Sequence, residues 1–180
     1  MLNITIPETD LYDEKTNEFT SVKEQTIVLE HSLVSLSKWE SKWCKPFYEK
    51  KEKTREETID YIRCMTITQH VKPEVYLCIT KDIELEVMKY IEAPMTATTF
   101  SNQKRGGTNR EQITSELIYY WMIAFNIPFE CQKWHLNRLL TLIRVCEVKN
   151  SPPKKMSKGE LISRNRALNA ARKKQLNSKG

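Results

Sequence analysis

Residues 113–146 read ITSELIYYWMIAFNIPFECQKWHLNRLLTLIRVC, and their apolar side chains recur at the three- and four-residue intervals of helices. The apolar residues of a first helix, which Asn126 ends, are Ile113, Leu117, Tyr120, Trp121, Ala124 and Phe125. Pro128 suits the first turn of a second helix, because a proline at that position leaves no N–H unsatisfied. The apolar residues of that second helix are Phe129, Trp134, Leu136, Leu139, Leu140, Leu142, Ile143 and Cys146. So short a turn between two long helices predicts an antiparallel helical hairpin at the core of the fold.

Three further helices are expected before this hairpin. The first is amphipathic, begins at Ser32 and ends before Pro46, and its apolar residues are Leu33, Leu36, Trp39 and Trp43. Thr54 and Glu57 form a capping box, which predicts the start of a second helix. The third opens at residues 80–82 and stops at Pro94. A loop with its tip at residues 103–107 follows.

The N-terminus has the pattern of strands. Residues 2–6 alternate apolar and polar side chains, and residues 25–30 are rich in β-branched residues, so the two segments predict a short β-hairpin. Residues 8–21 between them are polar and predicted to be turn-rich. The sequence therefore predicts a mainly α protein: a small helical domain built on the long hairpin, with N-terminal strands.

The charge is concentrated at the C-terminus. The whole chain carries a net charge of +6, but residues 150–180 hold nine basic residues and one acid, a net charge of +8, which leaves −2 for residues 1–149. Pro152 and Pro153 end the second helix of the hairpin and form a stiff exit. Residues 160–176 then predict a basic helix with a thin apolar stripe. We expect an α-rich body at residues 1–150 and a hinge with a basic helical tail at residues 151–180.

The sequence lacks the signals of several enzyme classes. Only four glycines are present, which excludes GxGxxG and Walker-type phosphate loops. Five cysteines without a CxxC pair argue against a zinc site or a disulfide scaffold and predict buried, reduced thiols. The histidines are interpreted as structural or surface residues. Only His135 has even one candidate ligand at metal spacing, which is Cys131. We expect no catalytic residue, no metal, no cofactor and no enzymatic activity. No apolar run is long enough for a membrane helix.

Two groups of residues are candidates for binding a partner. Trp39 and Trp43 share one predicted helix, where aromatic side chains serve mostly as core residues and otherwise as interface anchors. The basic candidates of the tail are Lys154, Lys155, Arg164, Arg166, Arg172, Lys173 and Lys174. Because a basic, weakly apolar helix is marginal alone, it suits docking on an acidic protein surface with folding coupled to binding. A solvated extension and contact with nucleic-acid phosphates are the alternatives.

Three segments together resemble tail assembly chaperones of long-tailed, siphovirus-type bacteriophages. They are residues 32–43 (SLVSLSKWESKW), residues 118–129 (IYYWMIAFNIPF) and residues 164–172 (RNRALNAAR). The likeness extends in the same order over most of the chain, from about residue 22 to the end. It consists of whole segments rather than a compact motif, so it carries over no individual site residue.

The resemblance implies a non-enzymatic protein of the host-cell cytoplasm. Such chaperones bind the tape-measure protein, keep its helical, aggregation-prone surface covered, and deliver tail-tube subunits for polymerisation around it. Self-association stays open, and neither nucleic acid nor a membrane is an expected partner. Two other functions stand as alternatives: a structural virion component, such as a tail completion or connector protein, and a small basic nucleic-acid-binding protein.

Overall fold

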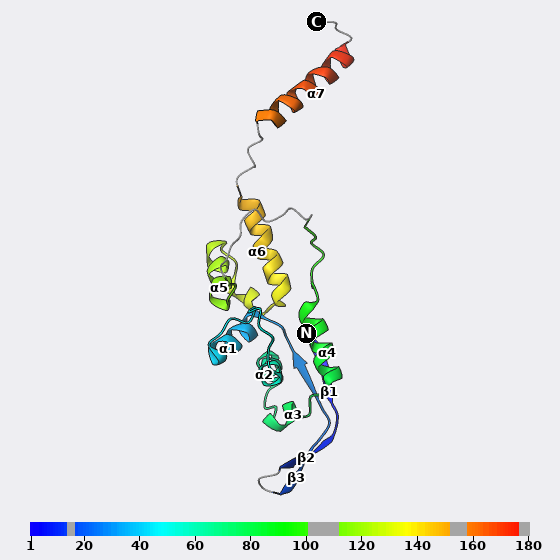
Figure 1. Cartoon of the computed structure of the whole chain (residues 1–180), viewed down its shortest axis with the longest axis vertical. Coiled ribbons are helices and arrows are strands. Elements are labelled where there is room, and N and C mark those ends of the chain that lie inside the picture. The colour runs from blue at the N-terminus through cyan, green and yellow to red at the C-terminus, as the bar shows by residue number, and fades with distance from the viewer. Residues whose placement is uncertain (14–16, 101–111, 152–157, 177–180) are drawn as a thin grey trace. The chain divides into compact units, whose positions relative to one another are not determined.

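A computed structural model describes residues 1–13, 17–100, 112–151 and 158–176 (Figure 1). The chain divides into two units, Met1–Val148 and Lys149–Gly180. Helices account for most of the described residues, which confirms the prediction of a mainly α protein. The two hinge prolines and the loop tip at residues 103–107 lie outside the described residues.

The first and last N-terminal strands form the predicted hairpin. β1 (Leu2–Ile6) pairs antiparallel with β4 (Gln25–Leu29). The register places Ile4 opposite Ile27, and both side chains are buried. Because side chains alternate between the two faces of a strand, this register puts one apolar face of the hairpin on the core.

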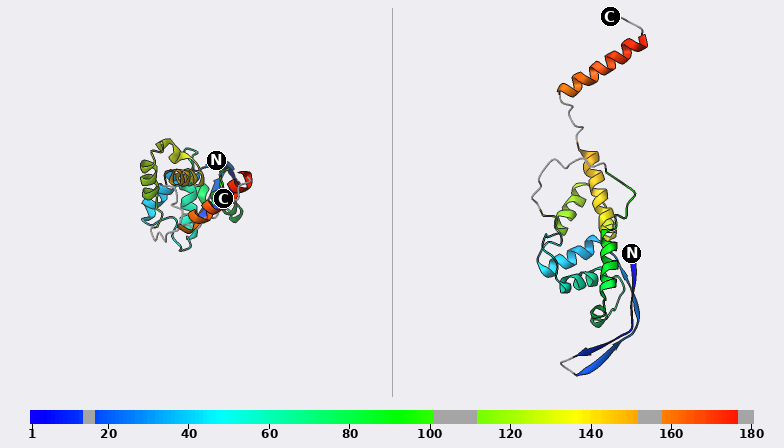
Figure 2. Two further views of the ribbon diagram at one scale, coloured as in Figure 1. Left: turned by 90° about the horizontal axis from the view of Figure 1, so that it is seen from above. Right: turned by 45° about the vertical axis from the view of Figure 1, so that its right-hand side comes forward.

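A second pair of strands occupies the segment between them. Residues 8–21 are not simply turn-rich, as predicted, because β2 (Thr9–Asp13) pairs antiparallel with β3 (Glu18–Val22). Tyr12 and Phe19 lie opposite each other in this pair, with ring centroids 5.0 Å apart. An aromatic cross-strand pair stabilises β structure even among polar residues. Figure 2 shows the second pair extending beyond the helices of the larger unit.

α1 (Leu33–Trp43) contacts the helices at Arg55–Met65 and Ser115–Ala124. The Ser32 hydroxyl caps its start by accepting a hydrogen bond of 3.2 Å from the Ser35 N–H. Its fully buried apolar residues are Leu33, Leu36 and Trp39. The helix ends at Cys44, which has a φ of 51° and donates its N–H to the Glu40 carbonyl at 2.8 Å. The first predicted helix is therefore confirmed.

α2 (Arg55–Met65) begins with the predicted capping box. The Thr54 hydroxyl accepts from the Glu57 N–H at 3.3 Å, and the Thr54 N–H donates to the Glu57 carboxylate at 3.0 Å. After the helix, the Ile67 N–H donates to the Val28 carbonyl at 2.8 Å. This bond fastens the segment that follows α2 to the edge of β4.

Two helices follow α2. α3 (Pro73–Leu77) is short and was not predicted from the sequence. α4 (Lys81–Glu92) is the third predicted helix, and the Thr80 hydroxyl caps it. Its buried residues, Val87 and Tyr90, are three apart and face the core, where α4 contacts β1.

α5 (Ser115–Ala124) is the first helix of the predicted hairpin, and it packs chiefly against α1 (Figure 1). Its buried residues are Ser115, Ile118 and Met122. The apolar residues that marked this helix in the sequence do not share one buried side, because Trp121 and Phe125 pack against the core whereas Tyr120 and Ala124 are exposed. Apolar residues occupy nearly every position of α5, so their spacing does not define one face. Asn126 ends the helix as predicted, with a φ of 53°.

The second helix of the predicted hairpin begins later than expected. η1 (Phe129–Lys133) is a 3₁₀ helix, and α6 runs over Leu136–Asn150. A tertiary contact explains the break, because the Leu136 N–H donates to the His31 carbonyl at 2.7 Å and holds the preceding residue beside α1. Among the described residues the principal helix pairs are α1 with α2 and α1 with α5. Extensive packing of α5 along α6, as in a long hairpin, is therefore not confirmed.

The smaller unit contains α7 (Lys158–Leu176), which confirms the predicted tail helix. None of its side chains is buried. Its exposed large apolar residues are Leu161, Ile162, Leu168 and Leu176. By itself, then, α7 has an apolar surface without a packing partner.

Candidate partner-binding site

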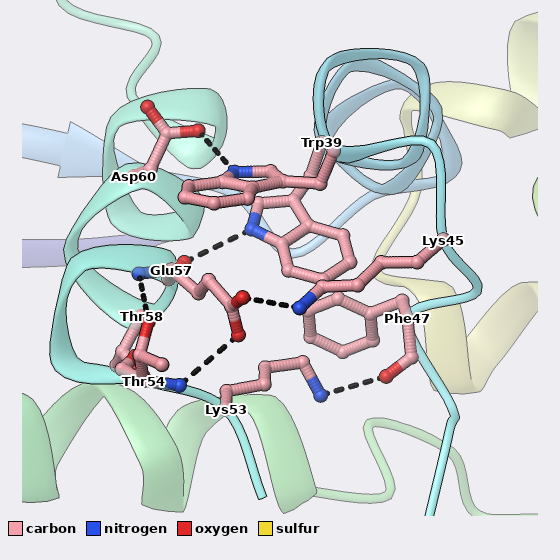
Figure 3. Close-up of polar contacts among 9 residues, drawn as sticks. Trp39, Lys45, Phe47, Lys53, Thr54, Glu57, Thr58 and Asp60 are labelled. Carbon is pink, nitrogen blue, oxygen red and sulfur yellow. Dashed lines mark hydrogen bonds and ion pairs between the residues drawn. The ribbon is translucent and has the colours of Figure 1, made fainter. Parts of the chain in front are cut away.

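Trp39 lies in the interface between α1 and α2. Its side chain is fully buried, and its Nε1 donates a hydrogen bond of 2.9 Å to the Glu57 carbonyl (Figure 3). The rings of Phe47 and Tyr61 lie edge-on to the indole, with centroid distances of 5.2 and 6.4 Å. Trp39 is therefore a core residue, and its indole has no free surface with which to contact a partner.

Two lysines lie over the same aromatic cluster (Figure 3). Lys45 pairs with the Glu57 carboxylate, and this hydrogen bond lowers the pKa of the carboxyl. The Lys53 Nζ lies 4.0 Å from the Phe47 ring centroid and donates to the Phe47 carbonyl at 2.6 Å. Burial lowers the pKa of the Lys53 ammonium. Because both cations have internal partners, the cluster closes the α1–α2 interface and is not a free anion-binding surface.

Trp43 is half-buried at the surface of the same interface. Its Nε1 donates to Asp60 Oδ2 at 2.9 Å, while Lys42 pairs with Asp60 Oδ1. The indole lines a groove of about 520 Å³, here called the Trp43 groove. The apolar residues of this groove are Trp43, Ile59, Pro73, Tyr76 and Leu77. The charged residues that line it are Lys42, Arg55, Glu56, Asp60, Arg63 and Glu74. A groove lined by apolar residues and by charges of both signs suits the side chains of a polypeptide.

The basic candidates of the tail are only partly described. Lys154 and Lys155 lie outside the described residues. The candidates on α7 are all exposed and are Arg164, Arg166, Arg172, Lys173 and Lys174. Counted over Lys158–Leu176, α7 has six basic residues and one acid, a net charge of +5. At 3.6 residues per turn the cations are distributed around the helix, so α7 presents positive charge on several sides.

Two histidines form a buried polar cluster. The rings of His31 and His135 have centroids 5.1 Å apart, and His31 Nδ1 lies 2.6 Å from the Tyr61 hydroxyl. His31 Nε2 has no hydrogen-bond partner in the described part of the chain. Burial, with a contribution from His135, lowers the pKa of His31 to about 3, and burial also lowers the pKa of His135. The cluster is closed to solvent and joins the start of α1 to the start of α6, so it is structural.

Glu40 is a buried polar residue that the sequence patterns did not indicate as functional. Glu40 is buried on α1, and its carboxylate accepts hydrogen bonds from the N–H groups of Phe47 at 2.8 Å and Ser115 at 2.7 Å. Glu40 follows Leu36 by four residues and so lies on the predicted apolar side of the helix. An acid on an apolar stripe is the signal that could have identified it, because a buried carboxylate needs hydrogen-bond donors.

Comparisons with protein-family models, with curated proteins and with solved structures find no match for this chain. Among the residues that the structure describes, no helix is both long enough and apolar enough to cross a membrane. In the same residues, no three histidine, cysteine, aspartate or glutamate side chains are grouped to hold a metal ion. The candidate binding surfaces are therefore defined by geometry alone: the Trp43 groove and the exposed basic helix α7.

Proposed function

We propose that this protein is a non-enzymatic tail assembly chaperone of a siphovirus-type phage. In this proposal it binds the tape-measure protein in the host-cell cytoplasm and assists recruitment of tail-tube subunits. The observation that carries the proposal is α7, a helix of 19 residues none of whose side chains is buried. The likeness of residues 32–43, 118–129 and 164–172 to such chaperones gives the proposal its specific client.

An exposed helix such as α7 needs a partner. Most helical stability in proteins comes from packing an apolar face, and α7 packs none. A helical protein with acidic side chains would cover its leucines and pair with its net charge of +5. Folding of α7 would then be coupled to binding, as is common for segments that wrap a long partner.

The Trp43 groove supports the same function through a different chemistry. Its apolar residues can contact the large side chains of a helical client, whereas α7 supplies positive charge. Two modest contacts on one chain bind more strongly than either alone, because the second becomes intramolecular once the first has formed. In this proposal the helical body provides the apolar contact, and the tail provides a contact steered by charge.

Co-expression with the tape-measure protein encoded by the same genome tests the proposal. We expect the wild-type chain to increase the soluble fraction of that protein and to co-purify with it. The triple variant Arg166→Glu, Lys173→Glu, Lys174→Glu should capture less of it, because these side chains are exposed on α7. The matched control Lys23→Glu, Lys50→Glu, Lys51→Glu reverses three exposed charges of the body and should capture as much as the wild type. A tape-measure protein that stays insoluble and is not captured would contradict the proposal.

Mass spectrometry of purified particles separates a chaperone from a virion component. A chaperone acts before the tail is complete, so we expect its peptides to be missing from particles in which tail-tube peptides are abundant. A copy number comparable to that of other minor tail proteins would favour a structural tail or connector protein instead.

A further inference from the structure

The outward side of α5 is apolar except for Glu116, and no residue of the described part of the chain covers it. Only Glu116 is charged among its ten residues. Ile118 and Met122 bury one side against the core, whereas Tyr120 and Ile123 on the opposite side are 63% and 61% exposed. Phe129 of the adjoining η1 is 53% exposed, so we refer to these three exposed side chains together as the α5–η1 face.

The composition of α5 is that of an enclosed helix. Helices that are apolar on all sides are normally buried, because water solvates none of their faces well. α4 provides the contrast within the same unit: it also exposes Leu85 and Met88, at 59% and 45%. The exposed charged residues around them are Lys81, Asp82, Glu86, Lys89 and Glu92. α4 is therefore a solvated surface helix, whereas α5 has one charged residue, Glu116.

The α5–η1 face is held in place before any partner arrives. At one end of α5, the Ser115 N–H is bound by the buried Glu40 carboxylate at 2.7 Å. At the other end, the Ile127 N–H donates to the Met122 carbonyl at 2.8 Å in a Schellman motif. Tyr119 links α5 to η1, because its hydroxyl donates to Gln132 Oε1 at 2.9 Å. A surface fixed in this way loses little conformational entropy when it binds.

Area and charge together indicate the occupant. The three side chains present on the order of 350 Å² of apolar surface, well below the roughly 800 Å² that each partner of a stable dimer contributes. Exposed acids adjoin the face, because Glu116 lies four residues before Tyr120 on the same side of α5 and Glu130 follows Phe129. A small apolar surface with acids beside it fits one side of a single amphipathic helix. We propose that the α5–η1 face binds an amphipathic helical segment of the client, an inference that rests on the proposed chaperone function.

Charge insertion on the full-length chain tests this inference. Ile123→Glu and Tyr120→Glu place an acid on the α5–η1 face, and Leu85→Glu makes the same kind of change at a similarly exposed site on α4. The probes are the co-expressed tape-measure protein and overlapping synthetic peptides that span it. Thermal unfolding of each variant establishes that it is folded. We expect binding to weaken about tenfold or more for the α5 variants and less than about twofold for Leu85→Glu.

Each outcome separates the inference from the proposed function. Equal binding by the wild type and the α5 variants would overturn the inference and leave the chaperone function standing. Failure of the wild type to bind any peptide or the intact protein would overturn both. A concentration-dependent dimer in light scattering that Ile123→Glu abolishes and Leu85→Glu preserves would show that a second copy covers the face, which also overturns the inference.

Discussion

The carboxylate of Glu40 accepts a hydrogen bond of 2.7 Å from the backbone N–H of Ser115. Ser115 is the first residue of α5, where a backbone N–H has no partner within the helix. The other carboxylate oxygen accepts from the Phe47 N–H at 2.8 Å. One buried side chain of α1 therefore fixes both the turn after α1 and the start of α5, and it does so with negative charge at the positive end of a helix dipole.

Glu40→Ala is expected to destabilise the body strongly. The substitution leaves two N–H groups without their charged acceptor, which should cost about 2–4 kcal/mol in the free energy of unfolding. Glu40→Gln keeps one acceptor and should cost about 1–2 kcal/mol. Urea titration followed by circular dichroism measures both, with the exposed Glu49→Gln as a control that should change stability by less than about 0.5 kcal/mol. If Glu40→Ala unfolded at the same urea concentration as the wild type, these hydrogen bonds would contribute little to the stability of the body.

The stability of the body should decrease in mild acid because of the histidine cluster. Burial lowers the pKa of His31 from 6.5 to about 3, so the unfolded chain binds a proton that the folded chain does not. Stability is therefore constant with respect to this group above pH 6.5 and falls as the pH drops from 6.5 towards 3. At pH ~5 this one histidine should lower the free energy of unfolding by about 2 kcal/mol relative to its value above pH 6.5.

Urea titrations across this pH range test the role of His31. The readout is the slope of stability against pH, because His31→Gln also changes packing beside Tyr61 and His135. We expect a shallower slope for His31→Gln and an unchanged slope for His70→Gln, whose side chain is exposed. The same slope in His31→Gln and the wild type would assign the acid sensitivity to other groups.

Asn126 should tolerate glycine and reject valine. Its φ of 53° lies in the left-handed region, which glycine adopts freely and β-branched residues avoid. We expect Asn126→Gly to change stability by less than about 0.5 kcal/mol and Asn126→Val to reduce it by about 1–2 kcal/mol. Thermal unfolding provides the comparison, and equal melting temperatures for the two variants would mean that the end of α5 is not held in this conformation.

Deleting residues 151–180 should leave the body folded. Every residue of the hydrophobic core in the described part of the chain lies at or before Cys146, so the deletion removes none of them. The truncated chain should unfold cooperatively near the wild-type melting temperature and should bind the tape-measure protein more weakly, with less dependence on salt. If the truncated chain no longer unfolded cooperatively, the body would not fold independently of its tail.

The sequence predicted the elements whose signals are local. Ser32 and Thr54 are N-caps whose hydroxyls bind backbone within three residues, and both helices begin where those residues predict. Asn126 likewise ends α5 through its own backbone conformation. Caps of this kind depend on neighbours in sequence, so a single sequence contains all the information they need.

The elements that were mispredicted depend on contacts distant in sequence. α6 begins at Leu136 because its N–H reaches the His31 carbonyl, and no local signal at Pro128 reveals that contact. The buried side of α5 could not be assigned from the sequence, because its apolar residues surround the helix. For the candidate site, the sequence indicated both tryptophans, but only the fold distinguishes buried Trp39 from half-buried Trp43. The burial of each tryptophan depends on which helices pack together, and the periodicity of a sequence does not specify that packing.

The most direct test of the chaperone function is capture of the tape-measure protein by the full-length chain with nuclease present, at moderate and at high salt. We predict capture at moderate salt and reduced but measurable capture at high salt, because salt screens the contact of α7 and leaves the apolar contacts of the body in place. Absence of capture at both salt concentrations, together with nucleic acid that co-purifies before nuclease treatment, would contradict the chaperone function and favour a nucleic-acid-binding protein.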